Sequence, residues 1–127
     1  MIRKNIHFML AAVCVTLSQG TYATADRDAK PVYMIAELTL KNPEVIGPYR
    51  EQVEATMKSY GGRFLVRGGK IVNIEGTASK GHIVISRFDS LAKAEAWYHS
   101  PAYQKILPYR HKAGETRLYF VEGLTLE

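Results

Sequence analysis

The stretch HIVISRFDSLAKAEAWYHSPAY, residues 82–103, decides the fold of this 127-residue chain. Its first seven residues have a β-branched centre and an aromatic end, which is typical of a strand. Asp89-Ser90 then supplies a helix N-cap, and we expect that helix to run to about residue 99. Ser100-Pro101 repeats the signal with a proline at the first helical position, so a further short helix follows.

The residues after this stretch complete the C-terminal half. Pro108 is expected to end or kink the short helix, because a proline inside a helix removes a backbone hydrogen bond. Residues 116–122 form the last predicted strand. The short helix is expected to face inward through Ala102, Tyr103, Ile106 and Leu107.

The N-terminal half of the domain begins with a predicted strand at residues 32–40, which are largely apolar and lack Gly and Pro. Asn42-Pro43 signals the start of a helix, and Gly47-Pro48 is expected to delay its regular part. Gly61-Gly62 ends this helix, since a helix C-terminus favours a left-handed residue. Its apolar face comprises Ile46, Tyr49, Val53, Met57 and Tyr60.

A glycine-rich region joins the two halves. Residues 63–67 predict a second strand, and Gly68-Gly69 marks a bend or bulge. Residues 70–75 are expected to continue in an extended conformation, and residues 76–81 form a turn-rich loop that leads to the strand at 82–88.

The order of elements is strand, helix, strand, strand, helix, short helix, strand. This is the ferredoxin-like βαββαβ arrangement of an α+β fold, an antiparallel sheet with helices on one face. The other face is expected to carry Tyr33, Ile35, Val84 and Phe88, which are too apolar to be left in contact with water. A second copy packed face to face is the simplest cover, so we expect a homodimer.

The N-terminus has the three parts of a secretory signal. Arg3 and Lys4 form its cationic start, residues 8–17 its apolar core, and Ala23-Thr24-Ala25 the small-residue pattern before a cleavage site. The apolar core is about half the roughly 20 residues that a membrane-spanning helix needs. We therefore expect residues 1–25 to be removed, and the protein to be exported across the inner membrane to the periplasm with no membrane association afterwards.

Cleavage would leave 102 residues, of which 26–31 are a short leader and 32–123 a single domain. Two basic residues leave while all 12 acidic residues stay, so the net charge falls from +5 to +3. That charge is too small to indicate nucleic-acid binding. Cys14, the only cysteine, leaves as well, and Val13 before it does not fit a lipoprotein signal. The remaining domain would have no disulfide, thiolate nucleophile or Cys-ligated metal.

Three segments carry a resemblance to a known family: YGGRFLVRGG at 60–69, AWYHSPAY at 96–103, and Arg110 with Gly123. Over about residues 32–123 they resemble the family named domain of unknown function 1330, within the dimeric α/β-barrel superfamily. The resemblance implies a ferredoxin-like fold and a homodimer whose two sheets form a barrel, but no established activity. Relatives in the superfamily include cofactor-independent monooxygenases of aromatic compounds, haem-degrading enzymes, muconolactone isomerases and small ligand-binding proteins. Members of this family mostly look cytosolic, so the export signal is a departure.

Polar and aromatic residues near the predicted third helix are candidates for a ligand site. Arg67 and Arg110, beside a helix N-terminus at Ser100, would suit a carboxylate or a phosphate. Trp97 and Tyr103 flank that helix start. The alternative is structural: Ser100 is then an ordinary N-cap, the two aromatic residues belong to the core, and the arginines are exposed or ion-paired.

Acidic and histidine side chains give weaker signals. Glu37 could be a base, because strand alternation aligns it with Tyr33 and Ile35 and burial in a barrel would raise its pKa; Glu75 is a second possibility. An exposed glutamate at a strand end is the alternative. The histidines at 82, 99 and 111 have no carboxylate at metal-ligand spacing, so we predict neither a metal nor a cofactor.

Three functions remain open at this stage. The first is a homodimer that binds a small anionic or aromatic molecule, which requires Arg67 and Arg110 to converge. The second is a cofactor-independent monooxygenase or isomerase, which requires an aromatic-lined cavity with a buried base. The third is a structural or stress-related dimer with no ligand, which a barrel filled by side chains would indicate. The sequence identifies no ligand, reaction or pathway.

Overall fold

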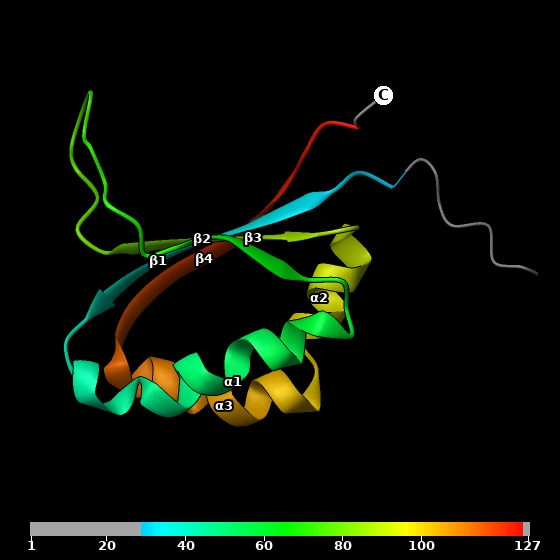
Figure 1. The fold of residues 1–127 in the computed structure, drawn as a ribbon, viewed down its shortest axis with the longest axis horizontal. Helices are drawn as coiled ribbons and strands as arrows, with labels where there is room; N and C mark the ends of the chain where they lie inside the picture. The colour runs from blue at the N-terminus through cyan, green and yellow to red at the C-terminus, as the bar shows by residue number, and fades with distance from the viewer. Residues whose placement is uncertain (1–28, 126–127) are drawn as a thin grey trace, which may run out of the picture.

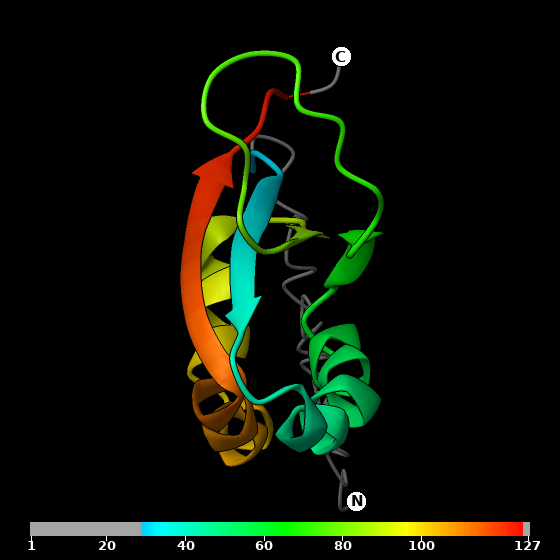
Figure 2. The same cartoon turned by 90° about the vertical axis from the view of Figure 1, so that its left-hand side faces the viewer.

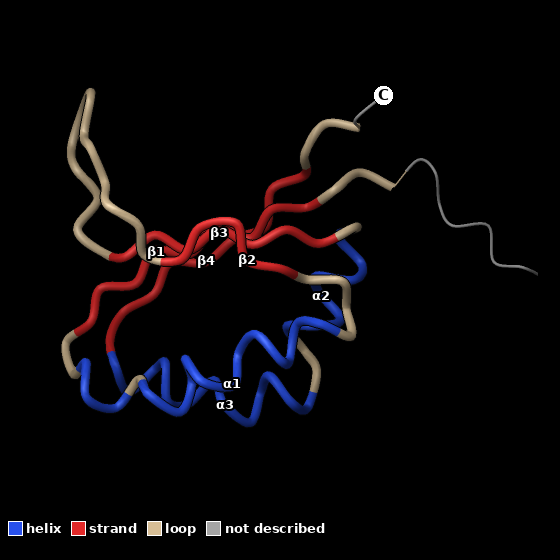
Figure 3. The backbone as a smooth tube through the Cα atoms, in the orientation of Figure 1, coloured by secondary structure: helices blue, strands red, loops and turns tan. Residues whose placement is uncertain are grey.

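The computed structural model describes residues 29–125, and the predicted signal segment lies outside this range. The described residues form a four-stranded antiparallel sheet with its helices on one face (Figures 1 and 3), so the predicted ferredoxin-like α+β fold is confirmed. The strand order is β2-β3-β1-β4. The strands are β1 (Val32–Leu40), β2 (Arg63–Arg67), β3 (His82–Phe88) and β4 (Gly114–Glu122). The helices are α1 (Gly47–Lys58), α2 (Leu91–Tyr98) and α3 (Pro101–Ala113), with a short 3-10 turn, η1 (Pro43–Val45), before α1.

The helix ends follow the capping signals in the sequence. Ser90 accepts a hydrogen bond from the Lys93 amide at the start of α2, and Ser100 accepts one from the Tyr103 amide at the start of α3. After α1, Gly61 has a φ of 71°, the left-handed conformation that favours glycine. No helix within residues 29–125 is long and apolar enough to cross a membrane.

The core lies between the sheet and the helices. Phe88 of β3, Trp97 of α2 and Tyr103 of α3 are fully buried, and the Trp97 ring centre lies 5.3 Å from that of Phe88 and 4.1 Å from that of Tyr103. Val32 and Met34 of β1 pack against this cluster. Because aromatic side chains bury large apolar areas, the cluster is a major source of stability.

The prediction for the open face of the sheet is correct for Tyr33 and Ile35 and wrong for Val84 and Phe88. The register pairs Val32 with Phe88, and paired residues share a face, so Phe88 belongs to the helix-covered side, as does Val84. Strand alternation divides residues into two sets but does not tell which set the helices cover. The apolar residues of the open face are Tyr33, Ile35, Val66, Ile83, Ile85, Tyr119 and Val121.

Two further expectations are wrong. Pro108 lies inside α3, which continues to Ala113, and this is tolerated because Pro108 and Gln104, whose carbonyl loses its partner, are both exposed. Residues 70–75 pair with no strand, because the left-handed Gly68 (φ 69°) turns the chain out of the sheet. They belong instead to a loop, residues 68–81, that projects from the sheet on the side away from the helices (Figures 1 and 2).

A bulge in β2 has a consequence for the cavity described below. Phe64 pairs with Ser86 and Arg67 with Val84, with a register shift between Phe64 and Val66. Residues three apart in a regular strand lie on opposite faces, but the extra residue of a bulge returns them to the same face. Phe64 and Arg67 therefore both face the helix-covered side.

Candidate functional site

A cavity of about 450 Å³ lies between the helix-covered face of the sheet and the helices α1 and α3. Its volume falls within the roughly 300–1,000 Å³ that small-molecule sites occupy. No Asp or Glu lines the cavity. Most of its wall is apolar, with Met34, Ala36, Leu38, Val53, Val84 and Leu118 among the residues. The polar side chains in the wall are Tyr49, Arg50, Arg67, His82 and Arg110.

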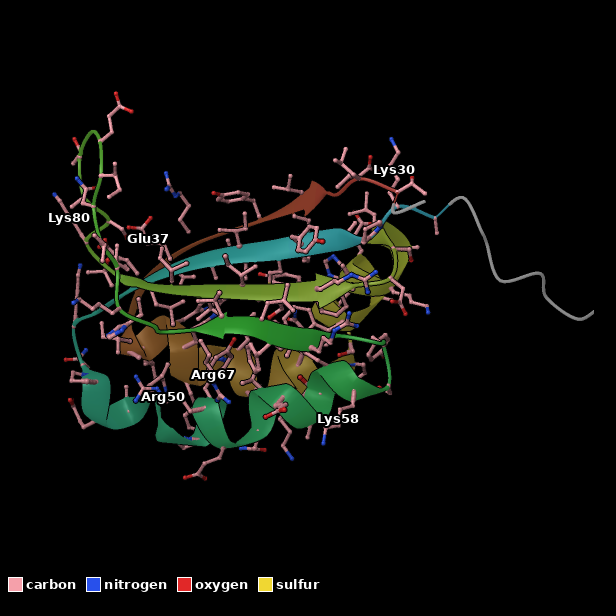
Figure 4. All side chains as sticks on the ribbon, turned by 45° about the horizontal axis from the view of Figure 1, so that its top comes forward. Lys30, Glu37, Arg50, Lys58, Arg67 and Lys80 are labelled. Carbon is pink, nitrogen blue, oxygen red and sulfur yellow. The ribbon has the colours of Figure 1, made fainter. Side chains whose placement is uncertain are left out.

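The cavity has an open end and a closed end. Arg50, Arg67 and His82 are exposed, so the open end lies between β2 and α1, where Figure 4 shows Arg50 and Arg67 close together. Ile46 and Arg110 are buried, so the closed end lies toward α3.

Arg110 is a buried cation that forms no ion pair with any residue of the described range. Only 4% of its surface is exposed, and its Nε and Nη1 atoms are enclosed and make no hydrogen bond. It takes part in none of the ion pairs among residues 29–125. It also borders a second hollow of about 380 Å³ beside β4, which is likewise lined by no Asp or Glu. Since a buried charge is costly unless it is paired, this guanidinium is a strong site for an anion.

Arg67 is already engaged by its neighbours. Its Nη2 donates to the backbone oxygen of Arg50 (2.7 Å), and its Nη1 lies 3.7 Å from a carboxylate oxygen of Glu54. Its Cζ lies 4.6 Å from the centre of the Phe64 ring, a cation–π distance that the bulge in β2 makes possible. The structure therefore brings both predicted arginines to one cavity. The charge of Arg67 is partly compensated by Glu54, whereas that of Arg110 is in no ion pair.

Tyr49 links the cavity to the aromatic core. Its hydroxyl lies 3.3 Å from that of Tyr103, and either can be the donor. The Cζ of Arg110 lies 5.9 Å from the centre of the Tyr49 ring. Burial raises the pKa of both phenols above the usual value for tyrosine, so both stay protonated and able to donate near neutral pH. Tyr103 does not line the cavity itself but supports Tyr49, which does.

Trp97 and Ser100 are structural rather than ligand-facing. The indole Nε1 of Trp97 donates to Oγ1 of Thr56 (3.0 Å), and the ring is fully buried. Ser100 caps α3 and donates to the backbone oxygen of Trp97 (2.6 Å). Neither residue lines the cavity. Their part of the family-like motif AWYHSPAY joins α2 to α3.

Glu37 lies on the opposite face of the sheet from the cavity. It accepts hydrogen bonds from the hydroxyl of Ser79 (2.7 Å) and the amide of Lys80, and forms an ion pair with Arg117 (3.1 Å). The hydrogen bond from Ser79, with smaller effects of Lys80 and Arg117, lowers the pKa of Glu37 below its usual value. The expected raised pKa is therefore wrong, and Glu37 is an ionised anchor for the loop 68–81 and not a base in the cavity.

The structure adds residues that the sequence did not single out as ligand candidates. Tyr49 was predicted only as part of an apolar helix face, and Arg50 gave no signal. His82 lines the open end of the cavity, whereas His99 and His111 do not line it. Within residues 29–125, no group of three or more His, Cys, Asp or Glu side chains could hold a metal ion.

Solved structures with the same fold include proteins of different description. A protein of unknown function from Rhodopseudomonas palustris is 18% identical, with a TM-score of 0.62 over 75% of this chain and 83% of that chain. SnoaB, a cofactor-independent oxygenase from Streptomyces nogalater, is 10% identical, with a TM-score of 0.55 over 76% of this chain and 95% of that chain. These likenesses establish the fold alone. No curated protein matches the chain.

The family assignment rests on the sequence match. Residues 31–124 match the family described as Domain of unknown function (DUF1330). The match includes the whole sheet, all three helices and every residue that lines the cavity. The chain therefore belongs to the DUF1330 family.

Proposed function

We propose that this protein binds a small anionic molecule in the cavity beneath the sheet, with the anionic group beside Arg110. The observation that carries the proposal is the unpaired guanidinium of Arg110, which is 4% exposed and borders the cavity. A charge-assisted hydrogen bond contributes about 1.5–3 kcal/mol, so an anion at Arg110 gains substantial affinity from this contact.

The composition of the cavity wall supports an anion as the ligand. Three arginines line it and no Asp or Glu of residues 29–125 does, so no carboxylate of the described residues pairs with Arg110 in the cavity, and a bound anion would supply a partner. The hypothesis of an oxygenase or isomerase required a base in the cavity. The carboxylate proposed for that role, Glu37, lies on the other face of the sheet, so binding is the better-supported function.

A second copy of the chain is the proposed partner for the open face. This face combines Tyr33, Ile35 and Ile85 with Tyr119 and Val121, and the last two are each 43% exposed. Two of the charged side chains that share it are held in ion pairs, Glu37 by Arg117 and Arg87 by Asp89, whereas Arg63, which pairs with Arg87 in the sheet register, lies exposed on the edge strand β2. A face whose centre is apolar is suited to a copy of itself, because a two-fold interface places the same surface on both sides.

The loop 68–81 supports the same partner. It projects on the side of the open face (Figure 1), and Ile71, Val72 and Ile74 on it are 45%, 66% and 88% exposed. Glu37 holds the base of the loop through Ser79 and Lys80. A second copy seated on the open face would cover these side chains, which otherwise remain in contact with water.

The proposed location is outside the cytosol, as the signal-like residues 1–25 suggest. Expression of the full sequence in a bacterium, followed by mass measurement of the protein in the periplasmic fraction, tests this part. We expect a product that begins at Asp26. A full-length product confined to the cytosol would contradict export and would leave the proposed cavity function untouched.

A thermal-shift screen of small anions tests the cavity function. Ligand at about 100 times its Kd stabilises a protein by about 2.7 kcal/mol, which raises the Tm of a domain of this size by several degrees. We expect such a shift in the wild-type protein and in the control Lys105→Met, which removes an exposed cation from the same helix. We expect no shift in Arg110→Met. If no anion shifts the wild-type Tm, or if Arg110→Met shifts as the wild type does, the proposal is wrong.

A further inference from the structure

The cavity of this protein has one buried positive charge that no ion pair compensates, and a mostly apolar wall. Arg110 is unpaired, whereas the guanidinium of Arg67 is held by Glu54 and by the backbone oxygen of Arg50. The third cation, Arg50, is exposed to solvent at the open end. The closed end therefore favours a ligand group that carries a single negative charge.

The donors near Arg110 match a carboxylate in number. The guanidinium offers N–H groups that reach a carboxylate through two parallel hydrogen bonds. Tyr49 also lines the cavity, with its ring centre 5.9 Å from the Arg110 Cζ, and when Tyr103 donates to it, its own hydroxyl proton is free to be the third donor of the proposed arrangement. A phosphate dianion would bring a second charge and further acceptor oxygens, and the other lining cation that is in no ion pair, Arg50, lies exposed at the open end of the cavity.

The rest of the cavity wall favours a ligand whose uncharged part is apolar. Met34, Ala36 and Val84 of the sheet face Val53 of α1 across the cavity, with Leu118 of β4 beside them. These side chains have no hydrogen-bonding groups, so a hydroxylated or amide-rich ligand would lose its contacts with water without replacement. Apolar groups gain on transfer to such a wall.

We propose that the ligand is a singly charged carboxylic acid with an aryl or alkyl body, bound with its carboxylate on Arg110 and Tyr49 and its body along the sheet. This inference rests on the proposed anion-binding function and narrows it to one ligand class. The cavity volume of about 450 Å³ accommodates a body the size of a substituted aromatic ring.

Calorimetric titration with four matched probes tests the ligand class. The probes are phenylbutanoate, its neutral amide, phenylglutarate with two carboxylates, and phenethyl phosphate. At neutral pH we expect phenylbutanoate to bind at least about 10-fold more tightly than each of the other three, because only it supplies one charge and an apolar body. We expect Arg110→Met to weaken its binding by about 10–100-fold. We expect the control Lys105→Met to leave binding unchanged.

Two further variants separate positioning from folding. Arg110→Lys keeps the charge but loses the planar pair of donors, so we expect binding of phenylbutanoate between that of the wild type and Arg110→Met. Tyr49→Phe keeps the ring and removes the hydroxyl, and we expect a loss of up to about 10-fold for phenylbutanoate and none for the amide. The circular dichroism spectrum of each variant should match that of the wild type.

The outcomes distinguish the two proposals. If phenethyl phosphate or phenylglutarate binds more tightly than phenylbutanoate in an Arg110-dependent manner, the ligand class is wrong and the anion-binding function stands. If the amide binds as tightly as the acid in an Arg110-dependent manner, the ligand class is again wrong, because the charge then contributes nothing. If none of the anionic probes binds, or if binding is insensitive to Arg110→Met, both proposals are wrong.

Discussion

The two faces of β1 differ in the side chains that they leave without a favourable contact. On the helix-covered face, Met34, Ala36 and Leu38 line a cavity whose polar wall includes a buried arginine with no partner. On the open face, Tyr33 and Ile35 are partly exposed apolar side chains, and Glu37 accepts hydrogen bonds from Ser79, Lys80 and Arg117. One face carries a buried cation that forms no ion pair, and the other carries exposed apolar side chains.

This difference indicates which kind of binding partner, a small ligand or a protein surface, suits each face. An unpaired buried charge is satisfied by a small ion or polar group, because a cavity of this size admits nothing larger. An exposed apolar sheet face is satisfied by a surface of similar size and character, which another protein provides. The ligand and the second copy are thus expected on opposite sides of the same strand. A substitution on one face should therefore abolish one of the two interactions and leave the other intact.

Substitution at the centre of the open face gives the largest expected effect. Ile35 pairs with Ile85 on one side and Tyr119 on the other, so Ile35→Lys would place two unpaired charges in a symmetric interface. Each unpaired charge costs several kcal/mol, so we expect a dimer in the wild type and a monomer in the variant at micromolar concentration. Analytical ultracentrifugation measures both states.

The control for this experiment is Leu91→Lys, because Leu91 is 37% exposed on α2 and lies away from the open face. It should leave the dimer intact. A monomeric wild-type protein would show that the open face needs no copy of itself. A dimeric Ile35→Lys would show that the interface lies elsewhere.

The fold was predictable from the sequence because its signals are local. The caps at Ser90 and Ser100 and the left-handed Gly61 act within a few residues of one another, and each works as expected. The face assigned to Phe88 was not predictable in this way. It depends on which side of the sheet the helices pack, and that is decided by contacts between residues far apart in the chain.

The site was predictable in part. Arg67 and Arg110 stand out in family-like segments, and both line the cavity. Trp97 and Ser100 also lie in a family-like segment, but their side chains make hydrogen bonds within the core and at the turn between α2 and α3. A buried turn between two helices accepts few residue types, so it produces a recognisable motif without a ligand. The sequence predicts Tyr49 only as part of an apolar helix face, because its ring fits that face, and the position of its hydroxyl beside that of Tyr103 is decided by the tertiary structure.

Loss of the α3 cap gives an intermediate effect and sharpens the distinction between core and cavity. Ser100→Ala removes the side chain that accepts from the Tyr103 amide and donates to the Trp97 carbonyl. We expect chemical denaturation to show a loss of about 1 kcal/mol in the free energy of unfolding. The affinity for an anion should stay within about 2-fold of the wild type, a change of about 0.4 kcal/mol. A loss of binding without a loss of stability would place Ser100 in the site.

The smallest expected effect concerns the pH dependence of the open face. Because the pKa of Glu37 is lowered on folding, the ionised carboxylate stabilises the folded state. This stabilisation is fully present above the unfolded-state pKa and is lost as the pH falls through the folded-state pKa. We expect NMR to show a Glu37 carboxyl that titrates below its usual range, and a Lys80 amide whose protection relative to intrinsic exchange falls once Glu37 is protonated. Glu37→Gln should abolish this pH dependence of Lys80 exchange. A Glu37 pKa at or above the usual value would instead agree with a buried base.

Arg110 is proposed to serve an external anion and not the stability of the fold. The unfolding free energy of the ligand-free protein tests this proposal, with wild type, Arg110→Met and the control Lys105→Met compared after exhaustive dialysis. Since removal of an unpaired buried charge relieves its desolvation cost, we expect Arg110→Met to be more stable by about 1–3 kcal/mol. Lys105→Met should stay within about 0.5 kcal/mol of the wild type. A clear loss of stability in Arg110→Met would contradict the claim, because it would show that the guanidinium already has a partner within the folded chain.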